Sequence, residues 1–314
     1  MFVFQNIEHI LHCAAKGDRM RIGEGEDLLL LRPKKTWEEQ DMETPILGKV
    51  AFITGAGYGV GCDPKKQGEH APNMGAAIAQ RLAKMGAVVV ATDINEEAAA
   101  VTVSSLATYP KNPAHSYFKL DVTDRAGIDA VLAEVQKRYG RLDIVCNNAG
   151  VSSMAPFEKL TEKEWDFNVD VNMKGVFLCM QAVIPYLKRG GRIVNTCSMA
   201  AIKPDPTLAH YTASKFGVLG LTKAAAIGLA GNGITVNCVC PGWVKTPMQD
   251  REIVWEGAMK GITPEEVRQS YIDHTPLGRL CYPEDVANAV AFFVLPESDF
   301  ITGEAMNVSG GANL

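Results

Sequence analysis

Tyr211 and Lys215 are four residues apart in the segment YTASK, residues 211–215. In a helix, residues with this spacing lie on one face with their Cβ atoms roughly 5–6 Å apart. A phenol has an ordinary pKa of about 10, and a nearby ammonium group lowers it by favouring the phenolate. The pair therefore predicts general acid–base chemistry, in which Tyr211 exchanges a proton with an oxygen atom of a reacting molecule.

A glycine-rich segment predicts a second site, one for a dinucleotide. The sequence TGAGYGVG, residues 54–61, follows the apolar run VAFIT. Glycines after a first strand let the chain turn tightly and let backbone N–H groups approach a pyrophosphate at the start of a helix. The glycines expected to contact the cofactor are Gly55, Gly57, Gly59 and Gly61.

The helix expected after this turn is delayed. Two prolines and a glycine within residues 62–74 disfavour a helix there, and the helical pattern begins only at Gly75. Asp93 ends the next apolar run, VVVATD, 18 positions after Gly75. A ribose-binding carboxylate is expected about 20 residues after the glycine turn. We therefore interpret residues 62–74 as a loop inserted into the phosphate-binding turn.

Asp93 also bears on the choice of cofactor. A carboxylate accepts hydrogen bonds from both ribose hydroxyls of NAD and repels the 2′-phosphate of NADP. NAD is therefore the predicted cofactor. Lys65 and Lys66 in the inserted loop could fold over a 2′-phosphate, so NADP stays open as the less favoured alternative.

The elements that must position these residues alternate along the chain. Helical patterns separate seven apolar runs typical of strands, at residues 50–54, 88–92, 116–120, 142–146, 192–196, 234–240 and 305–308. The helical patterns lie near residues 76–85, 95–106, 124–139, 163–188, 208–230 and 283–294. This alternation predicts one α/β domain with a doubly wound, parallel seven-stranded sheet of the Rossmann-like type and helices on both faces.

Eight motifs in order make residues 48–312 resemble the classical short-chain dehydrogenases/reductases. They are TGAGYGVG (54–61), LDV (120–122), NNAG (147–150), VNMKGVF (171–177), IVNTCS (193–198), YTASK (211–215), PGWVKTP (241–247) and ITGEAMNVSGG (301–311). The resemblance implies an oxidoreductase that transfers a hydride between NAD(H) and a secondary alcohol or ketone. The chain departs from the family pattern in its inserted loop, its long N-terminal extension and Ser309, which stands where the family commonly has Asp.

The resemblance implies four catalytic residues. Tyr211 would be the general acid/base, and Lys215 would support it and bind the nicotinamide ribose. Ser198 would hydrogen-bond the substrate oxygen. Asn172 would complete a water-linked proton relay to Lys215.

Further cofactor contacts are expected where other strands end. They are Asp121, Val122, Asn148, Ala149, Gly150, Pro241, Gly242, Val244 and Thr246. Residues 247–280 have mixed polarity and weak periodicity, which is typical of a mobile substrate lid. Apolar side chains in and near this segment favour a hydrophobic substrate, namely Met154, Met199, Trp243, Met248, Trp255 and Met259.

Composition excludes several other classes of protein. The 314-residue chain has a net charge of −5 and scattered basic residues, so nucleic acid is not an expected partner. Its eight cysteines show no CxxC pair or repeating spacing, which favours reduced core residues in a cytoplasmic protein over a metal site or disulfides. The sequence contains no run of eighteen apolar residues, so no membrane span is predicted. Residues 1–47 are an N-terminal extension of unknown role.

Two alternatives to a dehydrogenase stay open. One is an enzyme of the same fold with another outcome, such as an epimerase or an enoyl reductase. The other is a sensor or scaffold that binds NAD without turnover. The combination of Ser198, Tyr211 and Lys215 favours the dehydrogenase. The family resemblance also implies a homotetramer formed through the helices near 163–188 and 208–230.

Overall fold

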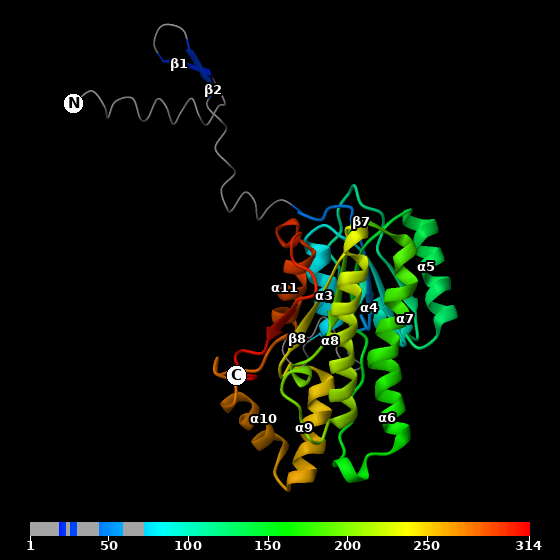
Figure 1. The fold of residues 1–314 in the computed structure, drawn as a ribbon, viewed down its shortest axis with the longest axis vertical. Helices are drawn as coiled ribbons and strands as arrows, with labels where there is room; N and C mark the ends of the chain where they lie inside the picture. The colour runs from blue at the N-terminus through cyan, green and yellow to red at the C-terminus, as the bar shows by residue number, and fades with distance from the viewer. Residues whose placement is uncertain (1–18, 23–25, 30–43, 59–71) are drawn as a thin grey trace, which may run out of the picture. The chain divides into compact units, whose positions relative to one another are not determined.

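The computed structural model describes residues 19–22, 26–29, 44–58 and 72–314 (Figure 1). The chain divides into two compact units, residues 1–44 and 45–314. In the first unit, β1 (Arg19–Ile22) and β2 (Glu26–Leu29) pair antiparallel. Most of the predicted inserted loop lies outside the described residues.

The second unit is built on one parallel sheet of seven strands in the order β5-β4-β3-β6-β7-β8-β9. The strands are β3 (Val50–Thr54), β4 (Val88–Asp93), β5 (Ser116–Lys119), β6 (Leu142–Asn147), β7 (Leu187–Thr196), β8 (Thr235–Pro241) and β9 (Ala305–Val308). The predicted fold class, a doubly wound seven-stranded sheet, is confirmed. Because the order reverses between β3 and β6, the chain leaves these two strands in opposite directions and opens a crevice at their carboxyl ends.

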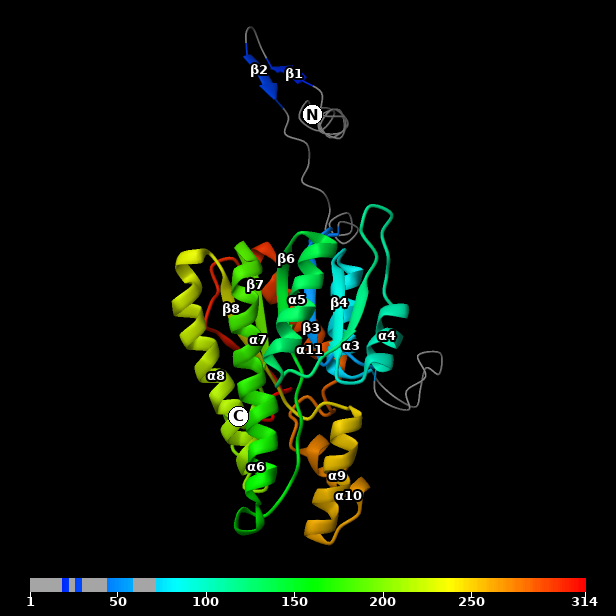
Figure 2. The ribbon, with the colours of Figure 1, turned by 90° about the vertical axis from the view of Figure 1, so that its right-hand side faces the viewer.

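Helices cover both faces of the sheet (Figures 1 and 2). One face carries α3 (Met74–Lys84), α4 (Glu96–Ser104) and α11 (Pro283–Val294). The other carries α5 (Arg125–Tyr139), α7 (Gly175–Val183) and α8 (Ala209–Leu229). No described helix is long and apolar enough to cross a membrane.

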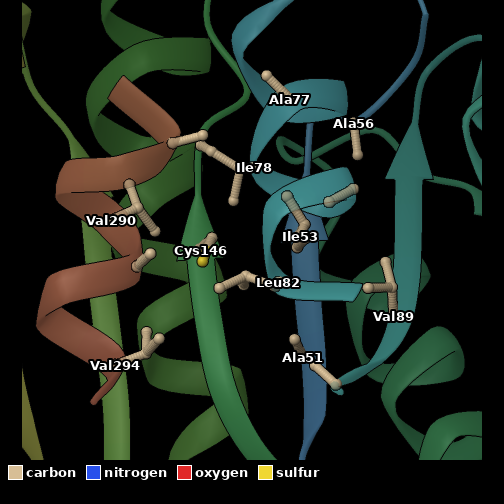
Figure 3. Packing of buried hydrophobic residues seen from close by; sticks show 14 of the residues in the cluster. Ala51, Ile53, Ala56, Ala77, Ile78, Leu82, Val89, Cys146, Val290 and Val294 are labelled. Atoms are coloured by element: carbon tan, nitrogen blue, oxygen red, sulfur yellow. The ribbon is translucent and has the colours of Figure 1, made fainter. Parts of the chain in front are cut away.

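The first strand shows why its sequence is apolar throughout. Successive side chains of a strand point to opposite faces. Ala51 and Ile53 of β3 therefore belong to the core under α3 and α11, whereas Val50 and Phe52 belong to the core under α5, α7 and α8. Figure 3 shows Ile53 facing Leu82 of α3 in the first of these cores. Full burial of one such side chain stabilises the fold by about 1.5–3 kcal/mol.

The helix expected at 163–188 is interrupted. It consists of α6 (Glu162–Val169), a π-helical turn η2 (Asp170–Lys174), α7, and a 3₁₀ turn η3 (Ile184–Tyr186). The predicted end at residue 188 was wrong because β7 already begins at Leu187. The π turn contains Asn172, so the irregularity lies at a predicted site residue.

Residues 247–280 contain two helices, α9 (Pro247–Lys260) and α10 (Pro264–Asp273). Each has a threonine N-cap, Thr246 or Thr263, followed by proline at the first helical position. Gly261 ends α9 with a left-handed φ of 67°. Local capping therefore orders a segment whose apolar periodicity is weak.

Candidate active site

Tyr211 and Lys215 lie one turn apart near the start of α8. The Lys215 Nζ atom is 5.5 Å from the centroid of the Tyr211 ring. Lys215 is only 3% exposed, and its ammonium group donates a 2.9 Å hydrogen bond to the carbonyl oxygen of Thr196 at the end of β7. The sheet and the helix together fix the lysine beside the phenol.

Asn172 lies next to this pair and is fully buried in the π turn. Its side chain accepts a 2.8 Å hydrogen bond from the Val151 N–H and donates a 2.9 Å bond to the Val151 carbonyl. A Cβ atom added at Gly150 would be 3.1 Å from Asn172 Oδ1 and 3.7 Å from Lys215 Nζ. The absence of a side chain at Gly150 in the NNAG motif therefore leaves room for both the amide and the ammonium group.

Ser198 and Tyr211 line one pocket of about 400 Å³. Ser198 follows β7 and caps a short 3₁₀ turn, in which its Oγ atom accepts a 3.1 Å hydrogen bond from the Ala200 N–H. The predicted residues Pro241, Gly242, Val244 and Thr246 line the same pocket. The carboxyl ends of β7 and β8 and the start of α8 thus converge on one cavity.

The electrostatics of the pair differ from the prediction that Lys215 makes the phenol acidic. Burial raises the pKa of Tyr211 above its ordinary value, and the Glu252 carboxylate raises it further, while the Ser198 hydroxyl lowers it. Burial also lowers the pKa of Lys215. Removing both groups from water disfavours their charged forms, and in the protein alone this effect outweighs their proximity.

The glycine turn packs closely against two other elements. Gly55 has a left-handed φ of 62°, and a Cβ atom there would be 2.6 Å from Ala149 Cα. The Gly57 N–H donates a 2.8 Å hydrogen bond to Asp93 Oδ2. Asn148 Nδ2 donates to the Gly55 carbonyl at 3.0 Å. Three residues predicted to bind the cofactor therefore contact the glycine turn, namely Asp93 at the end of β4 and Asn148 and Ala149 after β6.

Gly75, in the first turn of α3, packs against the glycine turn and was not among the predicted site residues. A Cβ atom at Gly75 would be 2.0 Å from the Gly55 carbonyl oxygen, so only glycine lets α3 approach the end of β3. Gly59 and Gly61, which were predicted instead, lie outside the described residues. The signal that could have identified Gly75 was its distance of 18 positions from Asp93.

The start of α3 is suited to an anion. Within the described residues, no side chain caps its first N–H groups, its first turn has no acidic residue, and Asn73 Oδ1 has no partner. Free N–H groups and the helix dipole favour negative charge at such an end. The turn, the helix end and the Asp93 carboxylate therefore fit the pyrophosphate and ribose of a dinucleotide.

The two other predicted contacts lie after β5, away from the Ser198 pocket. Asp121 Oδ1 accepts hydrogen bonds from the backbone N–H and the hydroxyl of Thr123, at 2.8 and 2.7 Å. Val122 is buried, and its side chain would be 2.7 Å from a Cβ atom at Gly175. Both residues follow β5, at the carboxyl edge of the sheet where cofactor contacts were expected.

Glu252 is a second residue that the sequence did not reveal. It projects from α9 into the pocket that holds Ser198 and Tyr211, and burial raises its pKa. Of the six apolar residues proposed to contact substrate, Trp255 and Met259 do not line the pocket. The remaining four do, namely Met154, Met199, Trp243 and Met248.

Comparisons of sequence identify relatives over most of the chain. Residues 70–313 match the family model described as enoyl-(acyl carrier protein) reductase. The 3-oxoacyl-[acyl-carrier-protein] reductase of Thermotoga maritima is 37% identical over 266 residues, which are 84% of this chain and 97% of the relative.

Solved structures agree with these sequence matches. A 3-ketoacyl-(acyl-carrier-protein) reductase from Brucella melitensis, complexed with NADH, superposes with a TM-score of 0.71 at 31% identity, over 86% of this chain and 100% of that one. A variant of actinorhodin polyketide ketoreductase with NADPH gives a TM-score of 0.75 at 32% identity, over 87% and 99%. The chain is thus an oxidoreductase that acts on CH–OH groups, and it belongs to the short-chain dehydrogenase/reductase family.

Proposed function

We propose that the protein transfers a hydride between NAD(H) and a secondary alcohol or ketone, with Tyr211 as the general acid/base. The observation that carries this proposal is the placement of Ser198 and Tyr211 in one pocket, with the Lys215 ammonium 5.5 Å from the phenol ring. A side chain that follows β7 and one from α8 can therefore act on the same substrate oxygen.

The chemistry divides between the cofactor and the chain. When bound, the nicotinamide ring supplies or accepts the hydride. In the reductive direction the ketone oxygen gains negative charge, and Tyr211 donates its proton to that oxygen. In the oxidative direction the phenolate takes the proton of the alcohol. The Ser198 hydroxyl donates a hydrogen bond that holds the oxygen within reach of Tyr211.

Lys215 and Asn172 would serve this proton transfer. The ammonium group favours the phenolate left after donation. Lys215 would also bind the nicotinamide ribose, and Asn172 would order a water molecule that returns a proton toward it. The proposed relay is supported by the proximity of Asn172 Oδ1 and Lys215 Nζ to the same Cβ position at Gly150, at 3.1 and 3.7 Å.

NAD is the cofactor we propose, and Asp93 is the reason. Its carboxylate lies at the end of β4 and is held at the glycine turn by the Gly57 N–H, where a ribose would meet it. A 2′-phosphate at this position would face a like charge. The relatives include one structure with NADH and one with NADPH, so the comparisons leave the choice open.

The pocket indicates a substrate with a hydrophobic portion. Four methionines and Trp243 line it together with Glu252, which can hydrogen-bond a polar substituent. The combination of Ser198, Tyr211 and Lys215 favours ketone reduction or alcohol oxidation over an epimerase or an enoyl reductase. The named relatives are enzymes, and none supports a sensor without turnover.

We also propose that the protein is a cytoplasmic homotetramer. Its mass in solution tests the oligomeric state, since the mass of four chains would support the proposal and the mass of one chain would refute it. Apolar side chains stay exposed on the two helices named for assembly, including Phe167, Phe177 and Phe216. Six cysteines within the described residues are free thiols, a state that a reducing compartment maintains.

Tyr211→Phe tests the catalytic role. Loss of the phenolic proton is expected to lower kcat by about 100- to 10,000-fold while leaving the Kd for NADH within about twofold. Turnover is followed by NADH absorbance with the best substrate from a panel of 3-ketoacyl thioesters, cyclic ketones, sterols and polyols. The matched control is Tyr117→Phe, on the exposed surface of β5. A Tyr211→Phe enzyme with more than a tenth of wild-type kcat would refute the mechanism.

Glu252→Gln tests the electrostatic setting. The carboxylate raises the pKa of Tyr211, so its removal is expected to lower that pKa and to shift the pH–rate profile of alcohol oxidation toward lower pH. Glu265→Gln, on the exposed face of α10, is the control and should leave the profile unchanged. An unchanged or alkaline-shifted profile for Glu252→Gln would show that this carboxylate does not act on the phenol.

Asp93→Ser tests the cofactor choice. The kcat/KM of the wild-type enzyme is expected to be at least about tenfold higher with NAD than with NADP. Asp93→Ser removes the charge repulsion between the carboxylate and the 2′-phosphate, which is worth roughly 1.4 kcal/mol. The preference for NAD should therefore fall by about tenfold in the variant. Asp129→Asn, an exposed carboxylate on α5, controls for the change in net charge. A wild-type preference for NADP would contradict the role given to Asp93.

A further inference from the structure

Three buried cysteines, Cys197, Cys238 and Cys240, form a thiol cluster beneath the active site. Their Sγ atoms all lie within 4.8 Å of one another. Cys197 is 2% exposed and the other two are fully buried. Among the described residues, no other group of three or more His, Cys, Asp or Glu side chains has its ligand atoms this close together.

The sheet brings the three thiols together. Cys238 and Cys240 are two positions apart on β8 and therefore point to the same face. Cys197 directly follows β7, the neighbouring strand, and its N–H donates a 2.8 Å hydrogen bond to the Val239 carbonyl. The cluster thus forms from neighbouring positions at the ends of two paired strands. It could not be predicted from the sequence, because the three cysteines have no CxxC spacing.

We propose that the thiol cluster is a binding site for one thiophilic metal ion, of the class of Zn²⁺ or Cu(I). Thiolate sulfur is the ligand that such ions prefer. Metal–sulfur bonds of about 2.3 Å place the sulfurs of a trigonal site about 4.0 Å apart, so the cluster needs to contract by less than about 1 Å. Side chains of neighbouring strands can make that adjustment by small χ1 rotations.

The surroundings suit the charge of such a site. A divalent ion M²⁺ that binds three thiols releases three protons and leaves a complex, M(SR)₃⁻, with one negative charge. The Lys215 ammonium group, on the helix packed over the cluster, interacts electrostatically with all three cysteines. Metal binding would therefore create an anion close to a cation that is already buried.

The site is also accessible. Cys197 lines the pocket that Ser198 and Tyr211 share, so an ion entering the pocket meets one thiol of the cluster first. Cys146 and Cys179 are buried in the cores on either face of the sheet and do not belong to the cluster. They supply matched controls within the same fold.

The test is a titration of the full-length, reduced protein with Cd²⁺, whose bonds to thiolates give an ultraviolet charge-transfer band. The band is expected to saturate at one Cd²⁺ per chain. Cys238→Ala and Cys240→Ala should each weaken Cd²⁺ binding by at least about 100-fold, because each removes a direct ligand. Cys179→Ala and a Cys13→Ala/Cys62→Ala double variant should leave the titration unchanged.

Circular dichroism and thermal unfolding show whether each alanine variant is folded, and Cys→Ser versions replace any that is not. The proposal is overturned if the wild-type protein gives no band in excess Cd²⁺. It is also overturned if the band survives in folded Cys238→Ala and Cys240→Ala proteins, or if it disappears in the Cys13→Ala/Cys62→Ala protein. Because this readout needs neither substrate nor cofactor, its outcome is independent of the proposed oxidoreductase function.

Discussion

Burial of a single ammonium group constrains the active site more than any other feature. Lys215 is almost fully enclosed, and charge that is removed from water must find partners. The Thr196 carbonyl supplies one at the end of β7, and the fixed side chain then lies beside Tyr211. The site depends on this arrangement because the same burial that disfavours the lysine's charge also keeps Tyr211 protonated. A protonated phenol is the form that can donate to a reduced carbonyl.

The fold explains why these groups meet. In a doubly wound sheet, the carboxyl ends of the strands lie at one edge, and the order reversal between β3 and β6 opens that edge. The glycine turn and Asp93 then occupy one side, while Ser198 and Tyr211 occupy the other. Gly75 is needed because α3 must approach the end of β3 to within backbone contact.

The sequence predicts the sheet and much of the pocket lining, and it misses features that depend on packing between distant segments. A strand covered on both faces, such as Val50–Thr54, is apolar throughout, and each helix start or end carries its own local signal. Three features were not predicted, because tertiary contacts decide them. The π turn at Asn172, the placement of Glu252 next to Tyr211 and the meeting of Cys197 with two cysteines of β8 depend on packing between distant segments. The hydrophobic periodicity of a single segment does not predict its contacts with distant segments.

In the proposed mechanism, the buried Lys215 ammonium sustains proton transfer by Tyr211. The most direct measurement is the pH dependence of kcat for alcohol oxidation, at saturating cofactor, in Lys215→Met and Lys215→Arg. Without a cation the phenolate loses its support, so Lys215→Met should move the profile toward higher pH and lower kcat at neutral pH by about 100-fold or more, and Lys215→Arg should restore part of that loss. A Lys215→Met enzyme with the wild-type profile and rate would contradict the account.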